Sequence, residues 1–209
     1  MQPFPKTEAQ SKNLGMSLPR LKELTAKYSG KVYSYMVDSV KVGAHFEQHG
    51  TGPNFQGGYI TLCTCKHQMR SRLTVSEWPG KWLAGFTSRA PLGDHWLFYL
   101  AKIGSAYESH AELWNSLPKR VRQAKSSRSN RLGDLHEPEG DSHGMNQFDP
   151  ADYHAPISGH SHRRNSCDNG WHIDVDYRRK KGLRKKPPRP SALLVCNRKL
   201  SFTVQTYRR

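Results

Sequence analysis

Acidic side chains are scarce in this sequence. It has 17 Asp and Glu against 33 Lys and Arg, which gives a formal net charge of +16 at pH 7. That excess attracts polyanions, so we expect nucleic acid, a nucleotide or an acidic protein as the partner. No stretch approaches the ~20 apolar residues of a membrane helix, and the first residues lack the apolar core of a signal peptide. These features predict a cytoplasmic protein with no membrane partner.

Apolar residues and cysteines are also few. Hydrophobic residues make up 35% of the chain, mean hydropathy is -0.82, and there are four cysteines. We expect a core over only part of the length and reduced thiols rather than a disulfide framework. No glycine fingerprint follows a predicted strand, which argues against a dinucleotide-binding fold or a P-loop. No site for S-adenosylmethionine is recognisable either, so the cofactor is left unknown.

The order of predicted elements indicates an α+β domain. Helices are expected over residues 19–28, after the cap Ser17 and Pro19, and over residues 107–117. A glycine-rich loop is expected at 43–58. Strands are predicted at residues 31–37, 59–65, 81–86, 95–103 and 191–196. Such a pattern is typical of a mostly antiparallel sheet, with a PUA-like barrel as a specific form by fold analogy.

The domain boundaries follow from composition. Residues 1–16 are expected to be a disordered N-terminus, and residues 17–209 to form a single domain. Residues 118–190 are polar, basic and poor in aliphatics, so we predict a long irregular insertion before the last strand.

Two thiols and several basic groups crowd the end of the second predicted strand. Cys65 is followed by Lys66, His67 and Arg70, and nearby positive charge stabilises a thiolate nucleophile. Lys66 and Arg70 could instead hold a phosphate. The alternative is a buried structural cysteine beside a solvated basic turn. Alternation places Cys63, Cys65 and Thr61 on one face of the strand. Their spacing is poor for structural zinc, so no metal site is predicted.

Two further features favour nucleic-acid binding. Aromatic side chains can stack on bases, and among them Phe55 and Trp82 adjoin glycine-containing turns. A proline-interrupted basic run would act as an extended arm that contacts phosphates, or would be a solvated linker. Its cations are Arg178, Arg179, Lys180, Lys181, Arg184, Lys185, Lys186 and Arg189.

Several short segments together resemble one family. They include Pro53-Asn54-Phe55 before the glycine pair, Cys65-Lys66 with Arg70, Trp82, and Gly133-Asp134. Over about residues 31–202 the chain resembles the nucleotide modification associated domain 2 family, found in bacteria and phages beside genes for base modification.

The resemblance implies a nucleic-acid- or nucleotide-binding protein associated with DNA base modification. It makes Cys65, Lys66 and Asp134 candidate catalytic residues, and it adds Asn54 and Phe55 to the candidate contacts with nucleic acid. Whether any reaction is catalysed stays open. The alternatives are a non-catalytic reader of modified bases and a basic scaffold that recruits a partner.

Overall fold

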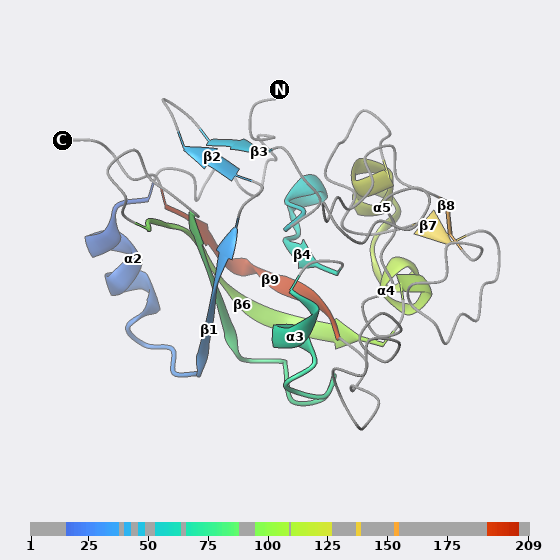
Figure 1. The fold of residues 1–209 in the computed structure, drawn as a ribbon, viewed down its shortest axis with the longest axis horizontal. Coiled ribbons are helices and arrows are strands. Elements are labelled where there is room, and N and C mark those ends of the chain that lie inside the picture. The colour runs from blue at the N-terminus through green and yellow to red at the C-terminus, as the bar shows by residue number, and fades with distance from the viewer. Residues whose placement is uncertain are drawn as a thin grey trace, which may run out of the picture.

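Figure 1 shows the fold in a computed structural model of the protein, with a curled sheet at its centre. The structure describes residues 16–37, 40–42, 46–48, 53–63, 66–87, 95–108, 110–126, 137–138, 153–154 and 192–204. All statements below concern these residues.

Five strands form the main sheet. Their order is β1 (Val32–Val37), β5 (Trp82–Thr87), β6 (Leu97–Tyr107), β9 (Leu193–Thr203) and β4 (Thr61–Leu62). The pair β1 and β5 is parallel, and the other three pairs are antiparallel. The sheet curls into a half-barrel (Figure 1). Since β6 and β9 are the longest strands and lie at the centre, they connect the two ends of the molecule.

Two short ribbons accompany the sheet. One pairs β2 (Val40–Val42) with β3 (Phe46–Gln48), and the other pairs β7 (Glu137–Pro138) with β8 (Tyr153–His154). Both pairs are antiparallel.

The helices are short. They are α2 (Leu18–Thr25), the 3-10 helix η1 (Gln56–Gly58), α3 (His67–Arg70), α4 (His110–Ser116) and α5 (Lys119–Ser126).

Helix α2 begins as its sequence predicts. The Ser17 hydroxyl accepts a hydrogen bond from the backbone nitrogen of Arg20 at 3.4 Å, and Pro19 lies in the first turn. The helix buries Leu21 against the sheet.

Aromatic and aliphatic side chains fill the concave face of the sheet. The centre of this inner core contains Phe55, Trp78, Phe98 and Tyr99, all without solvent exposure. The hydroxyls of Tyr35 and Tyr99 hydrogen-bond to each other inside it. Aromatic rings therefore supply the volume that the few aliphatics cannot.

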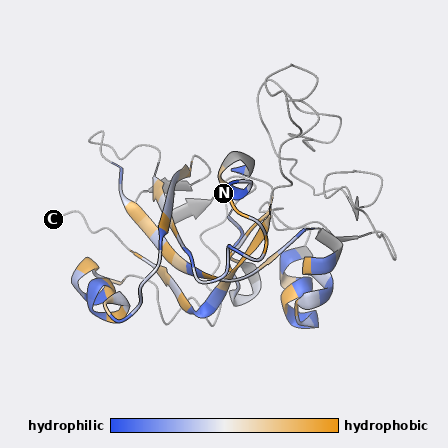
Figure 2. Cartoon of the chain, turned by 90° about the horizontal axis from the view of Figure 1, so that it is seen from below, coloured by the Kyte–Doolittle hydropathy of each residue, from blue (hydrophilic) through white to orange (hydrophobic). Residues whose placement is uncertain are grey.

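Two separate clusters cover the opposite, outer face. At one end α2 packs its Leu21 on Trp82, Phe202 and Val204. The members of the other cluster come from α4, α5, β9 and the end of β4, and they are Leu113, Trp114, Leu117, Val121, Leu193, Val195 and Cys63. Figure 2 shows helices at both ends of the sheet on the same side, with a hydrophilic stretch of ribbon between them.

The observed fold confirms a mixed α+β architecture, built mostly of strands with few helices. The strand predicted at 95–103 is the central strand β6, which continues to Tyr107. The strand predicted at 191–196 is β9, which extends to Thr203.

Three predictions of local structure need correction. Of the strand expected at 59–65, the described residues 59–63 form β4 over Thr61–Leu62, and residues 64–65 lie outside the described residues. The expected loop at 43–58 contains β3 and η1. Residues 119–126, assigned to the irregular insertion, form α5. Its sequence shows little apolar periodicity because its inward positions are occupied by Val121 and Lys125.

Candidate nucleic-acid interface

The predicted site residues fall into three groups. Asn54, Phe55, Arg70 and Trp82 are buried, and Lys66 is half-buried. The remaining predicted residues lie outside the described residues, and these are Cys65, Asp134, Arg178, Arg179, Lys180, Lys181, Arg184, Lys185 and Lys186.

Arg70 joins α3 to the start of β9. Its side chain is 0% exposed, and Nη1 donates to the carbonyl oxygen of Ala192 at 2.6 Å. Its own carbonyl accepts a hydrogen bond from Trp78 Nε1 at 2.9 Å. A charge-assisted bond to a buried carbonyl is stronger than a neutral one. In this conformation the guanidinium therefore links α3 to the residue before β9 and is turned away from solvent.

The two aromatic candidates for stacking lie on different faces of the sheet. Phe55 is 0% exposed in the inner core, and its ring packs edge-on against Tyr99 at 5.5 Å between centroids. Trp82 is 3% exposed on the outer face, with its ring 6.3 Å from that of Tyr28. Tyr28 is only half-buried, so it is the ring of this pair nearer to solvent.

Cys63 belongs to the outer cluster. It is buried against residues of α4, α5 and β9, whereas its neighbour Leu62 lies in the inner core. Thr61 points to the α5 side, because its hydroxyl contacts Lys125. The predicted alternation therefore holds from Thr61 to Cys63, and the structure places the Cys63 thiol in the core.

Lys66 has an unusual backbone. Its φ is 58°, in the left-handed region that non-glycine residues rarely adopt. Its carbonyl accepts hydrogen bonds from Met69 and Arg70, both at 3.0 Å, which starts α3. The ammonium lies 5.8 Å from the centroid of the Tyr35 ring.

Lys125, which no sequence pattern singled out, is the centre of a buried hydrogen-bond network. Its side chain is 2% exposed, and Nζ lies within hydrogen-bond distance of four oxygens, among which it shares its three N–H donors. The acceptors are the Asn54 carbonyl at 3.3 Å, Asn54 Oδ1 at 3.1 Å, the Tyr59 carbonyl at 2.7 Å and Thr61 Oγ1 at 3.1 Å. These contacts connect α5 to the segment that leads into β4. Asn54 is therefore a ligand of the lysine ammonium.

The glycine pair before β4 also serves this junction. Gly57 has a φ of +70°, and a Cβ there would lie 3.0 Å from the Cα of Val121. Glycine both adopts the left-handed conformation and lets α5 approach closely. Gly57 therefore makes room for α5.

A compact basic-aromatic group lies beside α2 on the outer face. The ammonium of Lys102 is 5.3 Å from the centroid of the Tyr28 ring and 5.7 Å from that of Trp82. Lys27 reaches the Tyr28 ring at 5.4 Å. Cations held over aromatic faces are attracted by the ring quadrupole. The arrangement leaves two ammonium groups around one half-buried tyrosine.

An irregularity in the central strands exposes two more cations opposite Lys102. Ala101 pairs with Ser201 and Ile103 pairs with Cys196, so the intervening part of β9 bulges opposite Lys102. Its residues Arg198 and Lys199 are exposed. We call Lys27, Tyr28, Lys102, Arg198 and Lys199 the outer basic surface.

Among the described residues, Arg20 and Glu23 form an ion pair at 2.6 Å, and no carboxylate pairs with the four cations of the outer basic surface. Within the described part of the chain, these four cations are therefore not neutralised.

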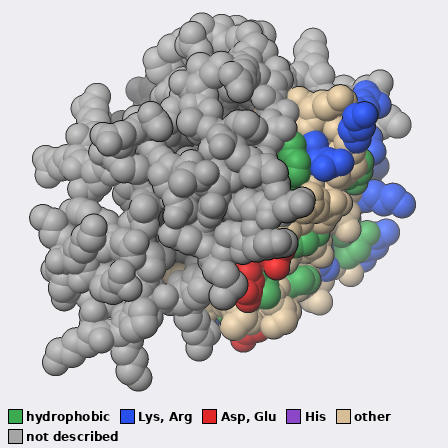
Figure 3. All heavy atoms as spheres, turned by 90° about the vertical axis from the view of Figure 1, so that its right-hand side faces the viewer, with side chains coloured by type: hydrophobic (Ala, Val, Ile, Leu, Met, Phe, Trp, Pro, Cys, Tyr) green, Lys and Arg blue, Asp and Glu red, His purple; other side chains and the backbone are tan. Residues whose placement is uncertain are grey.

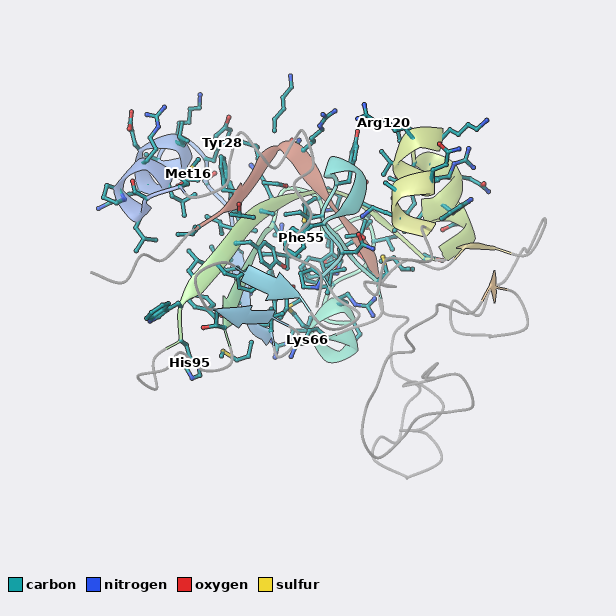
Figure 4. The ribbon with its side chains drawn as sticks, turned by 90° about the horizontal axis from the view of Figure 1, so that it is seen from above. Met16, Tyr28, Phe55, Lys66, His95 and Arg120 are labelled. Atoms are coloured by element: carbon teal, nitrogen blue, oxygen red, sulfur yellow. The ribbon has the colours of Figure 1, made fainter. Side chains whose placement is uncertain are left out.

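Helix α5 carries a second basic group. Arg122 lies over the Trp114 ring at 5.9 Å, and Lys119 and Arg120 are exposed. On this side of the molecule, basic side chains gather apart from the acidic ones (Figure 3). Figure 4 shows Tyr28 and Arg120 on the same side of the sheet, and Lys66 and His95 on the opposite side.

The described residues contain no group of three or more His, Cys, Asp or Glu that could hold a metal ion. None of their helices has the length and apolar character needed to cross a membrane. The family resemblance described above stays a prediction. Comparison with models of known protein families, with curated proteins and with solved structures found no match to this chain.

Proposed function

We propose that this protein binds nucleic acid or nucleotides and is associated with DNA base modification in the cytoplasm of a bacterium or phage-infected cell. The observation that carries the binding proposal is the outer basic surface, where Lys27 and Lys102 flank Tyr28 and the β9 bulge adds two cations. Lysine and arginine contact phosphates, and tyrosine stacks on bases. The link to base modification rests on the family resemblance alone.

The burial of earlier candidates changes where contact is expected. Arg70 and Asn54 are engaged in internal hydrogen bonds, and Phe55 lies inside the core. Tyr28 takes the stacking role that the sequence assigned to Phe55 and Trp82. The buried ring of Trp82 packs edge-to-face against the ring of Tyr28 and so fixes its position.

The concave side remains the candidate position for chemistry or for base recognition. Lys66 lies on that side with its ammonium near Tyr35. The curled shape of the sheet supports an analogy to small PUA-like barrels, which bind modified bases. In that case Lys66, Cys65 and Asp134 would contact the base, while the outer basic surface would bind the phosphate backbone of the nucleic acid. A reader without catalysis would use the same two faces.

Neutralising two cations of the outer basic surface tests the binding proposal. In the variant Lys102→Ala/Arg198→Ala we expect weaker binding to DNA, with the slope of log K against log salt reduced by about 2, because each phosphate contact adds about 1 to that slope. Fluorescence anisotropy across a salt series measures both quantities. The matched control is Arg72→Ala, an exposed cation that follows α3; it should bind as the parent does. Equal slopes for parent and double variant would contradict the proposal.

The link to modification needs a separate comparison. The probes are duplexes of one sequence, with and without a modified base. We expect a preference for the modified duplex that persists at high salt, since recognition of a base does not depend on counterion release. Binding that ignores the modification and disappears with salt would leave a general polyanion-binding protein and remove the association with base modification.

A further inference from the structure

The outer face of the sheet carries cation-aromatic groups at both of its ends. The α2 end has Lys102 over Tyr28, and the α5 end has Arg122 over Trp114. The exposed β9 bulge with Arg198 and Lys199 lies between the two helical clusters. Figure 2 shows this hydrophilic stretch of the ribbon between the helices, and Figure 4 places Tyr28 and Arg120 on one side.

Strand β6 sets the separation between these groups. It carries Lys102 at its midpoint, next to the rings of Tyr28 and Trp82, and its last residue, Tyr107, packs against the cluster that contains Trp114. At a rise of roughly 3.3 Å per residue the two positions are about 17 Å apart. A stacked nucleic-acid strand advances 3.4 Å per nucleotide, so about five nucleotides cover this distance.

From these observations we infer that the ligand of the outer face is a polynucleotide strand that contacts both ends at once, rather than a mononucleotide. Its phosphates follow the cations from Lys27 and Lys102 across the β9 bulge to Lys119 and Arg120 on α5. This inference rests on the proposed function and adds the class of ligand and its minimum length. A ligand that bridges two weak sites gains affinity because its second contact is intramolecular.

Oligothymidylates of 3, 6, 9 and 15 nucleotides test the inference with the full-length protein. We expect the three-nucleotide probe to bind weakly, and the affinity to rise at least tenfold once the strand passes about five or six nucleotides. Beyond that length the affinity should increase only slowly. In a titration with the 15-nucleotide probe, the tightest binding event should have a stoichiometry of one strand per protein.

The variant Lys119→Ala/Arg120→Ala separates the two ends. Both side chains are exposed, so the fold should be retained, which thermal unfolding checks. The variant should lose about tenfold in affinity for the 15-nucleotide probe and much less for the three-nucleotide probe. Equal losses for both probes, or no step in affinity with length, would overturn the inference while leaving nucleic-acid binding intact. Failure of the parent protein to bind any probe, duplex DNA included, would instead overturn the proposed function.

Discussion

Replacing Lys125 with methionine is expected to lower the free energy of unfolding by about 3 kcal/mol, because several buried oxygen acceptors lose their donor. Methionine keeps most of the volume of the side chain, so the loss reports hydrogen bonding rather than a cavity. The variant leaves the oxygens of Asn54, Tyr59 and Thr61 without the ammonium donor that they share. Each buried polar group that loses its bond costs about 1–3 kcal/mol.

Two opposing terms decide the size of this effect. Burying an ammonium costs several kcal/mol, and methionine removes that cost. Four oxygen acceptors compensate the ammonium in the native state, at distances from 2.7 to 3.3 Å. Since these acceptors stay buried in the variant, we expect the cost of their lost hydrogen bonds to exceed the gain from no longer burying an ammonium group. Urea unfolding measures the difference, and the melting temperature should fall by about 6–12 °C.

The control for this prediction comes from the same helix. Lys119 is exposed, and Lys119→Ala should change stability by no more than about 0.5 kcal/mol. A double-mutant cycle with Thr61→Val should show coupling of at least 0.5 kcal/mol, as contacting residues do. If Lys125→Met unfolds at the same urea concentration as the parent, the hydrogen-bond network does not stabilise the junction between α5 and β4.

Replacing Gly85 with alanine is expected to destabilise the protein by about 3 kcal/mol. Gly85 pairs with Tyr99 across β5 and β6, and a Cβ at Gly85 would overlap the Tyr99 ring and approach Phe98 Cε1 to 3.0 Å. Tyr99 cannot move away easily. It is fully buried, it packs on Phe55, and its hydroxyl bonds that of Tyr35. Overpacking of a dense core costs typically 1–3 kcal/mol, and a rigid neighbour places this site at the upper end.

A second glycine supplies the matched comparison. Gly80 has a φ of +84° but nothing within 4 Å of an added Cβ. Gly80→Ala should therefore cost only about 1 kcal/mol, from backbone strain alone. Adding Tyr99→Leu to Gly85→Ala should cost less than the sum of the two single changes, because the smaller side chain removes the overlap. Simple additivity of the two changes in thermal unfolding would refute the steric explanation.

Local sequence patterns predicted the elements that depend on local forces. The Ser17 cap and Pro19 predicted α2, and runs of β-branched and aromatic residues predicted β1, β5, β6 and β9. The helix predicted at 107–117 is α4. It begins later, because β6 continues to Tyr107, and it ends at Ser116, shortly before Pro118, since the residue before a proline disfavours helical geometry. Helix α5 was missed, since a lysine occupies one of its inward positions and weakens the apolar periodicity.

Whether a candidate site residue can contact a ligand depends on which way its side chain points, and the sequence does not show this. Arg70 and Asn54 were predicted to contact nucleic acid because arginine and asparagine are usually exposed. Only the three-dimensional arrangement supplied the Ala192 carbonyl for Arg70 and the ammonium of Lys125 for Asn54. Conversely, the Lys102–Tyr28 contact joins residues far apart in the chain, and no local pattern predicts it.

The sequence by itself determined the excess of positive charge, the α+β class and the scarcity of aliphatics that makes aromatic rings fill the core. These properties follow from composition and short-range preferences, which do not depend on how the strands are ordered. The tertiary structure alone decided which cations face solvent and which are buried. A charged group is buried where distant oxygens surround it, as at Lys125, and stays exposed where they do not, as at Arg198 and Lys199.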